Sequence, residues 1–124
     1  MKFVFDECIS YRIPNALKVL GKDAAPYSDH WAKGAPDTQW IPAASRAEWC
    51  IVTSDCLKRP HERAALREER GRVIVLATQN LSFWDQVKLV IKRWEDIEKV
   101  VRKKKPPYIL RFTARSRQPQ QLSV

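Results

Sequence analysis

The sequence predicts one α/β domain, with a doubly wound, mostly parallel sheet of four to five strands covered by helices on both faces. Short apolar segments alternate with segments whose apolar residues recur every three or four positions, as in strand–helix–strand units. Residues 73–77 (Val-Ile-Val-Leu-Ala) are all apolar, as in a strand buried on both faces. Acidic residues directly follow two of the predicted strands, where the carboxyl ends of parallel strands meet.

Three strands are predicted in the first half of the chain. Residues 3–5 (Phe-Val-Phe) form the first strand, and residues 8–20 form a helix with apolar residues at helical spacing. A weaker strand covers 24–28 and is followed by a loop and a helix at 37–48. Cys50–Thr53 forms the third strand. Right-handed connections then place the first and third strands side by side, in a strand order of about 2-1-3-4-5.

The second half begins with a polar helix at 60–70 and continues with the strand at 73–77. Ser82 is then placed to cap a long helix, with Asp85 three positions later. Residues 108–112 predict the last strand. The long helix carries one continuous apolar face, which we expect to be core, formed by Trp84, Val87, Ile91, Trp94, Ile97 and Val101.

Length and composition limit the possible classes of protein. The chain has 124 residues, which predicts a single domain at 1–113 and a basic, polar, disordered C-terminal tail at 114–124. No stretch approaches the roughly 20 apolar residues of a membrane span, and no signal peptide is visible, so we expect a cytoplasmic protein. Two histidines without zinc-ligand spacing and three glycines without a phosphate-binding loop argue against zinc chemistry and nucleotide hydrolysis.

The net charge of +9 favours a polyanionic partner. The segment 102–105 (Arg-Lys-Lys-Lys) and the later charges Arg111, Arg115 and Arg117 are all positive. Such patches bind phosphates with little sequence preference, which makes nucleic acid the expected partner. The alternative for 102–105 is a solvated helix end, where cations interact favourably with the helix dipole.

Three aspartates are the candidate catalytic residues. Asp6 follows the first strand, Asp55 follows the third, and Asp37 opens the helix before it. The predicted topology brings Asp6 and Asp55 to one edge of the sheet. Mg²⁺ and Mn²⁺ prefer carboxylate oxygens, so the sequence predicts a site for one of these ions. Each aspartate alone has the alternative of capping a helix.

These residues carry a resemblance to a known family. The segments 5–7 (Phe-Asp-Glu), 37–44 (Asp-Thr-Gln-Trp-Ile-Pro-Ala-Ala) and 51–55 (Ile-Val-Thr-Ser-Asp) resemble a compact PIN domain, more narrowly the PIN-like group of VapC-type toxins. Residues 80–84 and 106–109 are also similar to that group. The resemblance implies a metal-dependent ribonuclease, often a toxin neutralised by a cognate antitoxin, that commonly forms a homodimer.

The resemblance also implies roles for single residues. Asp6, Asp37 and Asp55 would ligate Mg²⁺ or Mn²⁺ as catalytic residues, and Thr53 would brace a ligand or a water. Longer PIN domains carry a further acid on a helical insertion that this chain lacks, and Glu7 is the nearest substitute. Cations flanking the acids are candidates for binding the RNA backbone. They are Arg12, Lys33, Lys58 and Arg59.

Two other functions fit parts of the pattern. A catalytically silent module would bind nucleic acid or a protein partner without cleavage. A receiver-like phosphoacceptor domain would use Asp6 and Glu7, Asp55 as the acceptor and Thr78. In a receiver the lysine ends the fifth strand, whereas Lys105 precedes the predicted strand at 108–112. That mismatch and the basic charge disfavour the receiver alternative.

Overall fold

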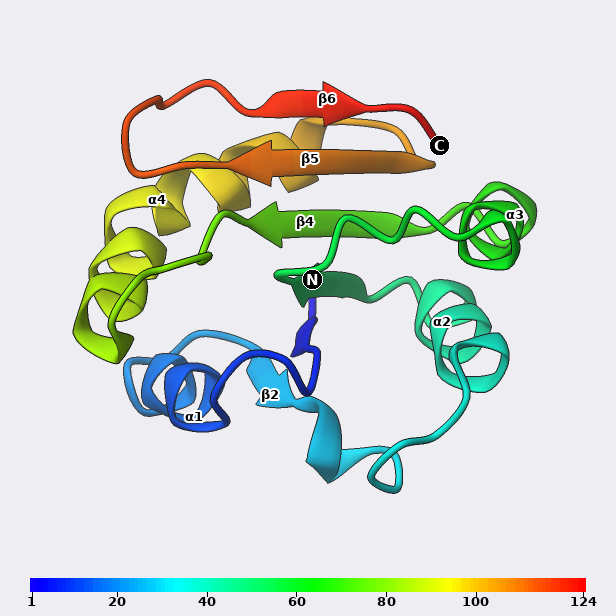
Figure 1. The fold of residues 1–124 in the computed structure, drawn as a ribbon, viewed down its shortest axis with the longest axis horizontal. Coiled ribbons are helices and arrows are strands. Elements are labelled where there is room, and N and C mark those ends of the chain that lie inside the picture. The colour runs from blue at the N-terminus through cyan, green and yellow to red at the C-terminus, as the bar shows by residue number, and fades with distance from the viewer.

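A six-stranded sheet lies between two pairs of helices in the computed structural model, which describes residues 1–124 (Figure 1). The elements follow one another as β1 (Phe3–Phe5), α1 (Arg12–Val19), β2 (Ala24–Pro26), the 3₁₀ helix η1 (Tyr27–Asp29), α2 (Asp37–Arg46), β3 (Cys50–Thr53), α3 (Pro60–Glu68), β4 (Arg72–Leu76), α4 (Phe83–Lys103), β5 (Tyr108–Phe112) and β6 (Gln120–Leu122). None of the helices is both long enough and apolar enough to cross a membrane.

The strand order is β2-β1-β3-β4-β5-β6, and all neighbours are parallel except β5 and β6. This confirms the predicted doubly wound α/β fold and the order of its first five strands. The register pairs Thr53 with Val75 and Val75 with Arg111. Strands β1 and β3 are neighbours, so the residues that follow them lie at the same carboxyl edge of the sheet.

The C-terminal tail is ordered, so the prediction that the last residues are disordered is wrong. Strand β6 pairs antiparallel with β5, in a register that includes Leu110 opposite Gln121. Leu122 and Val124 pack against the core cluster on one sheet face. The Arg63 guanidinium also donates a hydrogen bond to the Ser123 carbonyl. The sequence pattern missed this strand because it is short and polar. The segment is held in place by partners that are distant in the chain.

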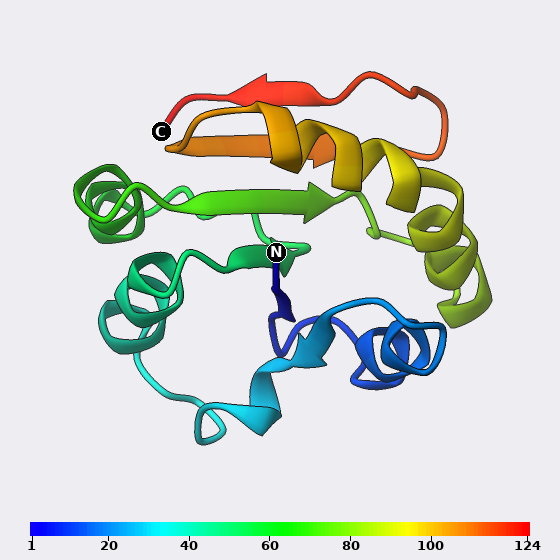
Figure 2. The same cartoon turned by 180° about the vertical axis from the view of Figure 1, so that it is seen from behind.

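Helices α1 and α4 cover one face of the sheet, and α4 crosses β4 and β5 (Figure 2). The Ser82 hydroxyl accepts a hydrogen bond of 3.1 Å from the Asp85 amide, which confirms the predicted cap. The core on this side is formed by side chains of both helices and of the strands beneath them. Its helical members are Ile13, Leu17, Leu89, Val90, Trp94, Ile97 and Val101.

The prediction that the whole apolar face of α4 is core is wrong for two residues. Trp84 is 64% exposed and Ile91 is 54% exposed. The first turns of α4, which include Trp84, extend beyond the ends of the strands (Figure 1). Further along, Leu89 and Val90 are the buried residues, which turns Ile91 towards solvent. Helical spacing identifies an apolar stripe but does not tell where the covered part begins.

Helices α2 and α3 cover the opposite face of the sheet (Figure 1). Both begin at the carboxyl edge of the strands and run back along the sheet. Their core side chains include Trp40, Ile41 and Ala44 from α2 and Leu66 from α3. The first turns of these two helices therefore lie next to the residues that follow β1 and β3.

Candidate active site

Asp6 and Thr53 form a hydrogen-bonded pair at the ends of neighbouring strands. The buried Thr53 hydroxyl donates to the Asp6 carboxylate at 2.9 Å, and the Glu7 amide donates to its other oxygen at 2.7 Å. Burial raises the pKa of Asp6 although these donors lower it, and the charge of Asp37 raises it further. Asp6 is thus held in a fixed orientation in surroundings that favour its neutral form, unless a cation is near.

Asp37 is the first residue of α2 and points inward rather than into bulk solvent. One carboxylate oxygen accepts a hydrogen bond of 3.0 Å from the Trp40 indole N–H. The other oxygen lies 4.0 Å from both the Arg59 guanidinium and the His61 imidazole. The predicted helix start is confirmed, and Trp40 in the next turn fixes the direction of the Asp37 side chain.

Glu62 is the residue that the sequence interpretation missed. It lies in the first turn of α3, is only 2% exposed, and accepts a hydrogen bond of 3.1 Å from the Arg59 amide. Ligand atoms of Asp37, His61 and Glu62 all lie within 4.8 Å of one another. Burial raises the pKa of Glu62, and the contact with Asp37 raises it further. A buried carboxylate from α3 and a partly exposed one from α2 therefore lie next to each other.

Asp55 follows β3 and lines a cavity together with Glu62. Its amide donates to the Thr53 hydroxyl at 3.0 Å, and its carboxylate accepts a hydrogen bond from the Leu57 amide at 2.9 Å. Asp55 itself is exposed, and its charge contributes to the raised pKa of Glu62. The group of ligand atoms within 4.8 Å of one another consists of Asp37, His61 and Glu62, and includes neither Asp55 nor Asp6.

Glu7, the predicted substitute for a further acid, is placed differently. Its exposed carboxylate accepts a hydrogen bond of 3.1 Å from the Gly34 amide, which ties it to the loop before α2. Its charge acts mainly on the Tyr27 hydroxyl, whose pKa is raised first by burial and next by Glu7. Glu62, and not Glu7, is the fourth acid that meets Asp37.

The four predicted RNA-binding cations are divided among three places. Lys58 and Arg59 line a cavity together with Asp55 and Glu62. Lys33 is exposed on the loop before α2. The Arg12 guanidinium lies 3.8 Å from the centre of the Phe83 ring, on the opposite sheet face. Only Lys58 and Arg59 therefore adjoin the acids directly.

One sequence signal could have identified Glu62. Pro60 suits the first position of a helix, so Glu62 is the third, where a side chain can reach back to the preceding amide. A helix that follows β3 begins at the carboxyl edge, which places this third position beside Asp55. The position of His61 in the sequence does not predict a metal ligand, because the residues that it meets, Asp37 and Glu62, come from two helices. Spacing within one segment cannot reveal such a group.

Residues 1–78 match the family model described as PIN like domain, a span that contains Asp6, Asp37, Thr53, Asp55 and Glu62. The chain belongs to the PIN-like domain family. Its six-stranded, mostly parallel sheet is consistent with that fold. No curated protein and no solved structure matched the chain.

The side chains at this PIN-like site fit a hard divalent cation. The carboxylate oxygens of Asp37 and Glu62 are ligands that Mg²⁺ and Mn²⁺ prefer, and a neutral imidazole such as that of His61 is also a transition-metal ligand. Burial is the main cause of the raised pKa of Glu62, and the contact with Asp37 raises this pKa further. A cation beside the two carboxylates would stabilise their charged forms. The geometry thus provides a possible acidic metal-binding group.

Proposed function

We propose that this protein is a metal-dependent endoribonuclease that hydrolyses RNA phosphodiesters with Mg²⁺ or Mn²⁺. The observation that carries the proposal is the buried Glu62 carboxylate next to Asp37, with the charge of Asp55 acting on Glu62 and the charge of Asp37 acting on Asp6. Desolvated like charges are costly, and a divalent cation is the group that offsets this cost. Membership of the PIN-like family and the excess of basic residues support RNA as the substrate.

Each residue has a defined part in this proposal. Asp6, Asp37, Asp55 and Glu62 would hold the cation, which would supply Lewis-acid polarisation of the phosphodiester and neutralise charge that develops on its oxygens. The Thr53 hydroxyl keeps Asp6 oriented through their 2.9 Å hydrogen bond.

Cations at the site contribute to binding the substrate. The ammonium of Lys58 and the guanidinium of Arg59 lie on the cavity wall and would contact the RNA backbone. Arg59 also lies 4.0 Å from Asp37, so it limits the repulsion among the acids while no RNA is bound.

The direct test is cleavage of RNA with Mn²⁺, with and without a chelator, by the wild-type protein and by Asp6→Asn and Asp55→Asn. We expect cleavage that the chelator abolishes and that either substitution lowers at least about 100-fold, because a metal ligand is lost. Asp23→Asn is the matched control, since Asp23 is exposed and precedes β2 at the opposite edge. RNA binding without cleavage under all conditions would instead favour a silent binding module.

We further propose that the nuclease is the toxin of a toxin–antitoxin pair of the VapC type. A cognate antitoxin would cover the basic surface or reach the acids, with an acidic surface or an inserted arginine as the means. Growth arrest on expression, absent for Asp55→Asn and relieved by the product of a small adjacent gene, is the expected result. Growth without arrest would point to a housekeeping nuclease. A homodimer remains part of this proposal.

A further inference from the structure

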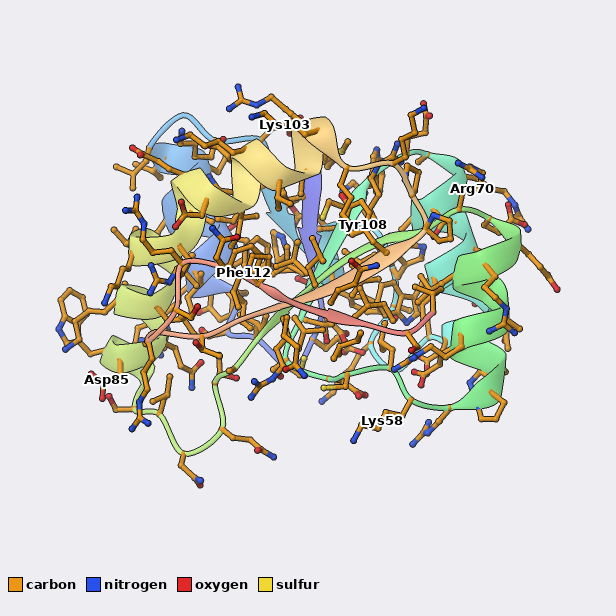
Figure 3. All side chains as sticks on the ribbon, turned by 90° about the horizontal axis from the view of Figure 1, so that it is seen from above. Lys58, Arg70, Asp85, Lys103, Tyr108 and Phe112 are labelled. Atoms are coloured by element: carbon orange, nitrogen blue, oxygen red, sulfur yellow. The ribbon has the colours of Figure 1, made fainter.

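A cavity of about 520 Å³ adjoins the acids, and one wall of it is not used by the proposed mechanism. It opens over the carboxyl ends of β3 and β4. Asp55 and Glu62 lie on one side of it, and Arg111 from β5 lies on another. Figure 3 shows Lys58 on the loop at this edge of the sheet and Lys103 at the opposite edge. Asp55 and Glu62 therefore line the same cavity as Arg111, which comes from a distant part of the chain.

The strand register aligns this cation with the acids. Thr53 pairs with Val75, and Val75 pairs with Arg111, so the three residues form one row across β3, β4 and β5. Val75 belongs to the core on the α2 and α3 face, and residues in register point to the same face. Arg111 therefore projects on the same side as the Asp6–Thr53 pair, about two strand spacings, or roughly 10 Å, from Thr53.

Arg111 has no charge partner within the protein. None of the ion pairs or side-chain hydrogen bonds of the structure involves its guanidinium, although the side chain is partly buried. By contrast, the Arg63 and Arg93 guanidiniums both donate to backbone carbonyls. A partly buried guanidinium that faces a cavity without a partner is suited to an anion from outside, and its fork geometry matches a phosphate.

We propose that Arg111 binds a backbone phosphate of the RNA strand, one or two nucleotides away from the bond that is cleaved. The location of that bond rests on the proposed function. A separation of roughly 10 Å along a row of strands matches phosphates that are near neighbours in one strand. The acids near Thr53 and the guanidinium of Arg111 then have different tasks. The acids would hold a cation that neutralises the reacting phosphate, and Arg111 fixes the direction in which the strand crosses the sheet.

The test is RNA binding by the full-length protein in a chelator, so that no metal-dependent cleavage takes place. Anisotropy of a labelled, short single-stranded RNA would compare Arg111→Gln with wild type. We expect about tenfold weaker binding, as for loss of a charge-assisted hydrogen bond. The dependence of log K on log salt should also become shallower by about 0.7, which is one phosphate of a single strand.

Arg70→Gln is the matched control, because Arg70 is exposed and precedes β4 at the opposite edge of the sheet. We expect it to leave both values close to those of the wild type. Arg111→Lys keeps the charge but not the fork of the guanidinium, so it should recover the salt slope and only part of the affinity. Equal effects of Arg111→Gln and Arg70→Gln would overturn the proposal, and so would a salt slope of Arg111→Lys that equals that of Arg111→Gln.

Replacing single phosphates of the RNA with neutral methylphosphonates locates the contact. At one linkage, Arg111→Gln should cost nothing further, because its partner charge is already gone. The losses should add at all other linkages. Additive losses at every linkage would overturn the proposal. If Arg111→Gln weakens binding as expected but the protein never cleaves RNA, the phosphate site stands and the nuclease proposal fails. If the protein cleaves RNA but Arg111→Gln binds RNA like the wild type, the nuclease proposal stands and the phosphate site fails.

Discussion

The two faces of the sheet differ in what their helices leave uncovered. Helix α4 has 21 residues and spans about 31 Å at 1.5 Å per residue, so with α1 it covers its face with apolar side chains. Helices α2 and α3 have 10 and 9 residues, each about 15 Å or less. They begin at the carboxyl edge of the strands, and the cavity beside Glu62 opens next to the first turn of α3.

Buried charge shows the same difference. On the α4 face, the Arg93 guanidinium is buried but fully paired, with hydrogen bonds to the carbonyls of Thr113 and Ala114 and an ion pair with Asp96. On the α2 and α3 face, Glu62 is buried against another acid. One face is organised for stability, and the other keeps an unfavourable arrangement that a ligand can relieve. The predictions below test this division.

The largest effect should come from Glu62→Gln. This change removes a carboxylate from the Asp37–Glu62 pair while keeping the acceptor for the Arg59 amide. We expect RNA cleavage to fall at least about 100-fold, as for a lost metal ligand. Glu95→Gln, on the exposed surface of α4, is the control and should cleave normally. Normal cleavage by folded Glu62→Gln would remove this residue from the site.

On the α4 face, Ile97→Ala should act on stability alone. Ile97 is 0% exposed, so the free energy of unfolding should fall by about 2–5 kcal/mol. Ile91→Ala, in the exposed position two turns earlier on the same helix, should change it by less than about 0.5 kcal/mol. Urea unfolding measures both. Cleavage per folded molecule should be unchanged in each, and a loss would contradict the separation of the faces.

Binding of Mn²⁺ should raise the melting temperature of the wild-type protein, because the ion binds only the folded chain. Asp37→Asn should melt higher than wild type in a chelator, since it relieves the repulsion on Glu62, and it should lose most of the increase with Mn²⁺. Differential scanning measures both. An equal Mn²⁺ increase in the two proteins would exclude Asp37 as a ligand.

The pH dependence of stability in a chelator follows from two raised pKa values. Asp6 and Glu62 both titrate above their ordinary values of 3.8 and 4.5, mainly because of burial. The folded state therefore holds these protons more tightly than the unfolded state. Their stabilising contribution is fully present below the unfolded pKa values and is lost as the pH rises through the folded ones.

The double variant Asp6→Asn, Glu62→Gln lacks both titrations. We expect its advantage in the free energy of unfolding over wild type to grow as the pH rises from about 4 to about 7. Urea unfolding at a series of pH values measures this difference. A difference that stays constant with pH would mean that the two acids do not titrate above their ordinary values.

The smallest effect on stability should come from Trp84→Ser. Trp84 and Ile91 border an apolar groove of about 290 Å³ between α1 and α4. If this groove forms the proposed homodimer interface, the substitution should halve the mass in solution while leaving the unfolding free energy of the monomer within about 0.5 kcal/mol. Light scattering measures the mass. An unchanged dimer would locate the interface elsewhere.

Particular residues illustrate what could be predicted from the sequence. The all-apolar segment of β4 indicated a strand buried on both faces, and Ser82 with Asp85 indicated the start of α4. The end of β1 placed Asp6, and Pro36 before Asp37 placed the start of α2. These features depend on neighbours within one or two turns. Local chemistry therefore sufficed to place the ends of these elements, and the right-handedness of the connections predicted the order of the first five strands.

The tertiary structure decided the features that depend on distant partners. Glu62 joins Asp37 because α2 and α3 begin side by side, and Arg111 faces the same cavity because β5 pairs with β4. The segment of β6 likewise forms a strand only because it pairs with β5. The sequence by itself determined the segments that form β1 to β5 and α1 to α4, since periodicity and capping are local. Which side chains meet was decided only by packing, because the groups that share charge or space come from segments far apart in the chain.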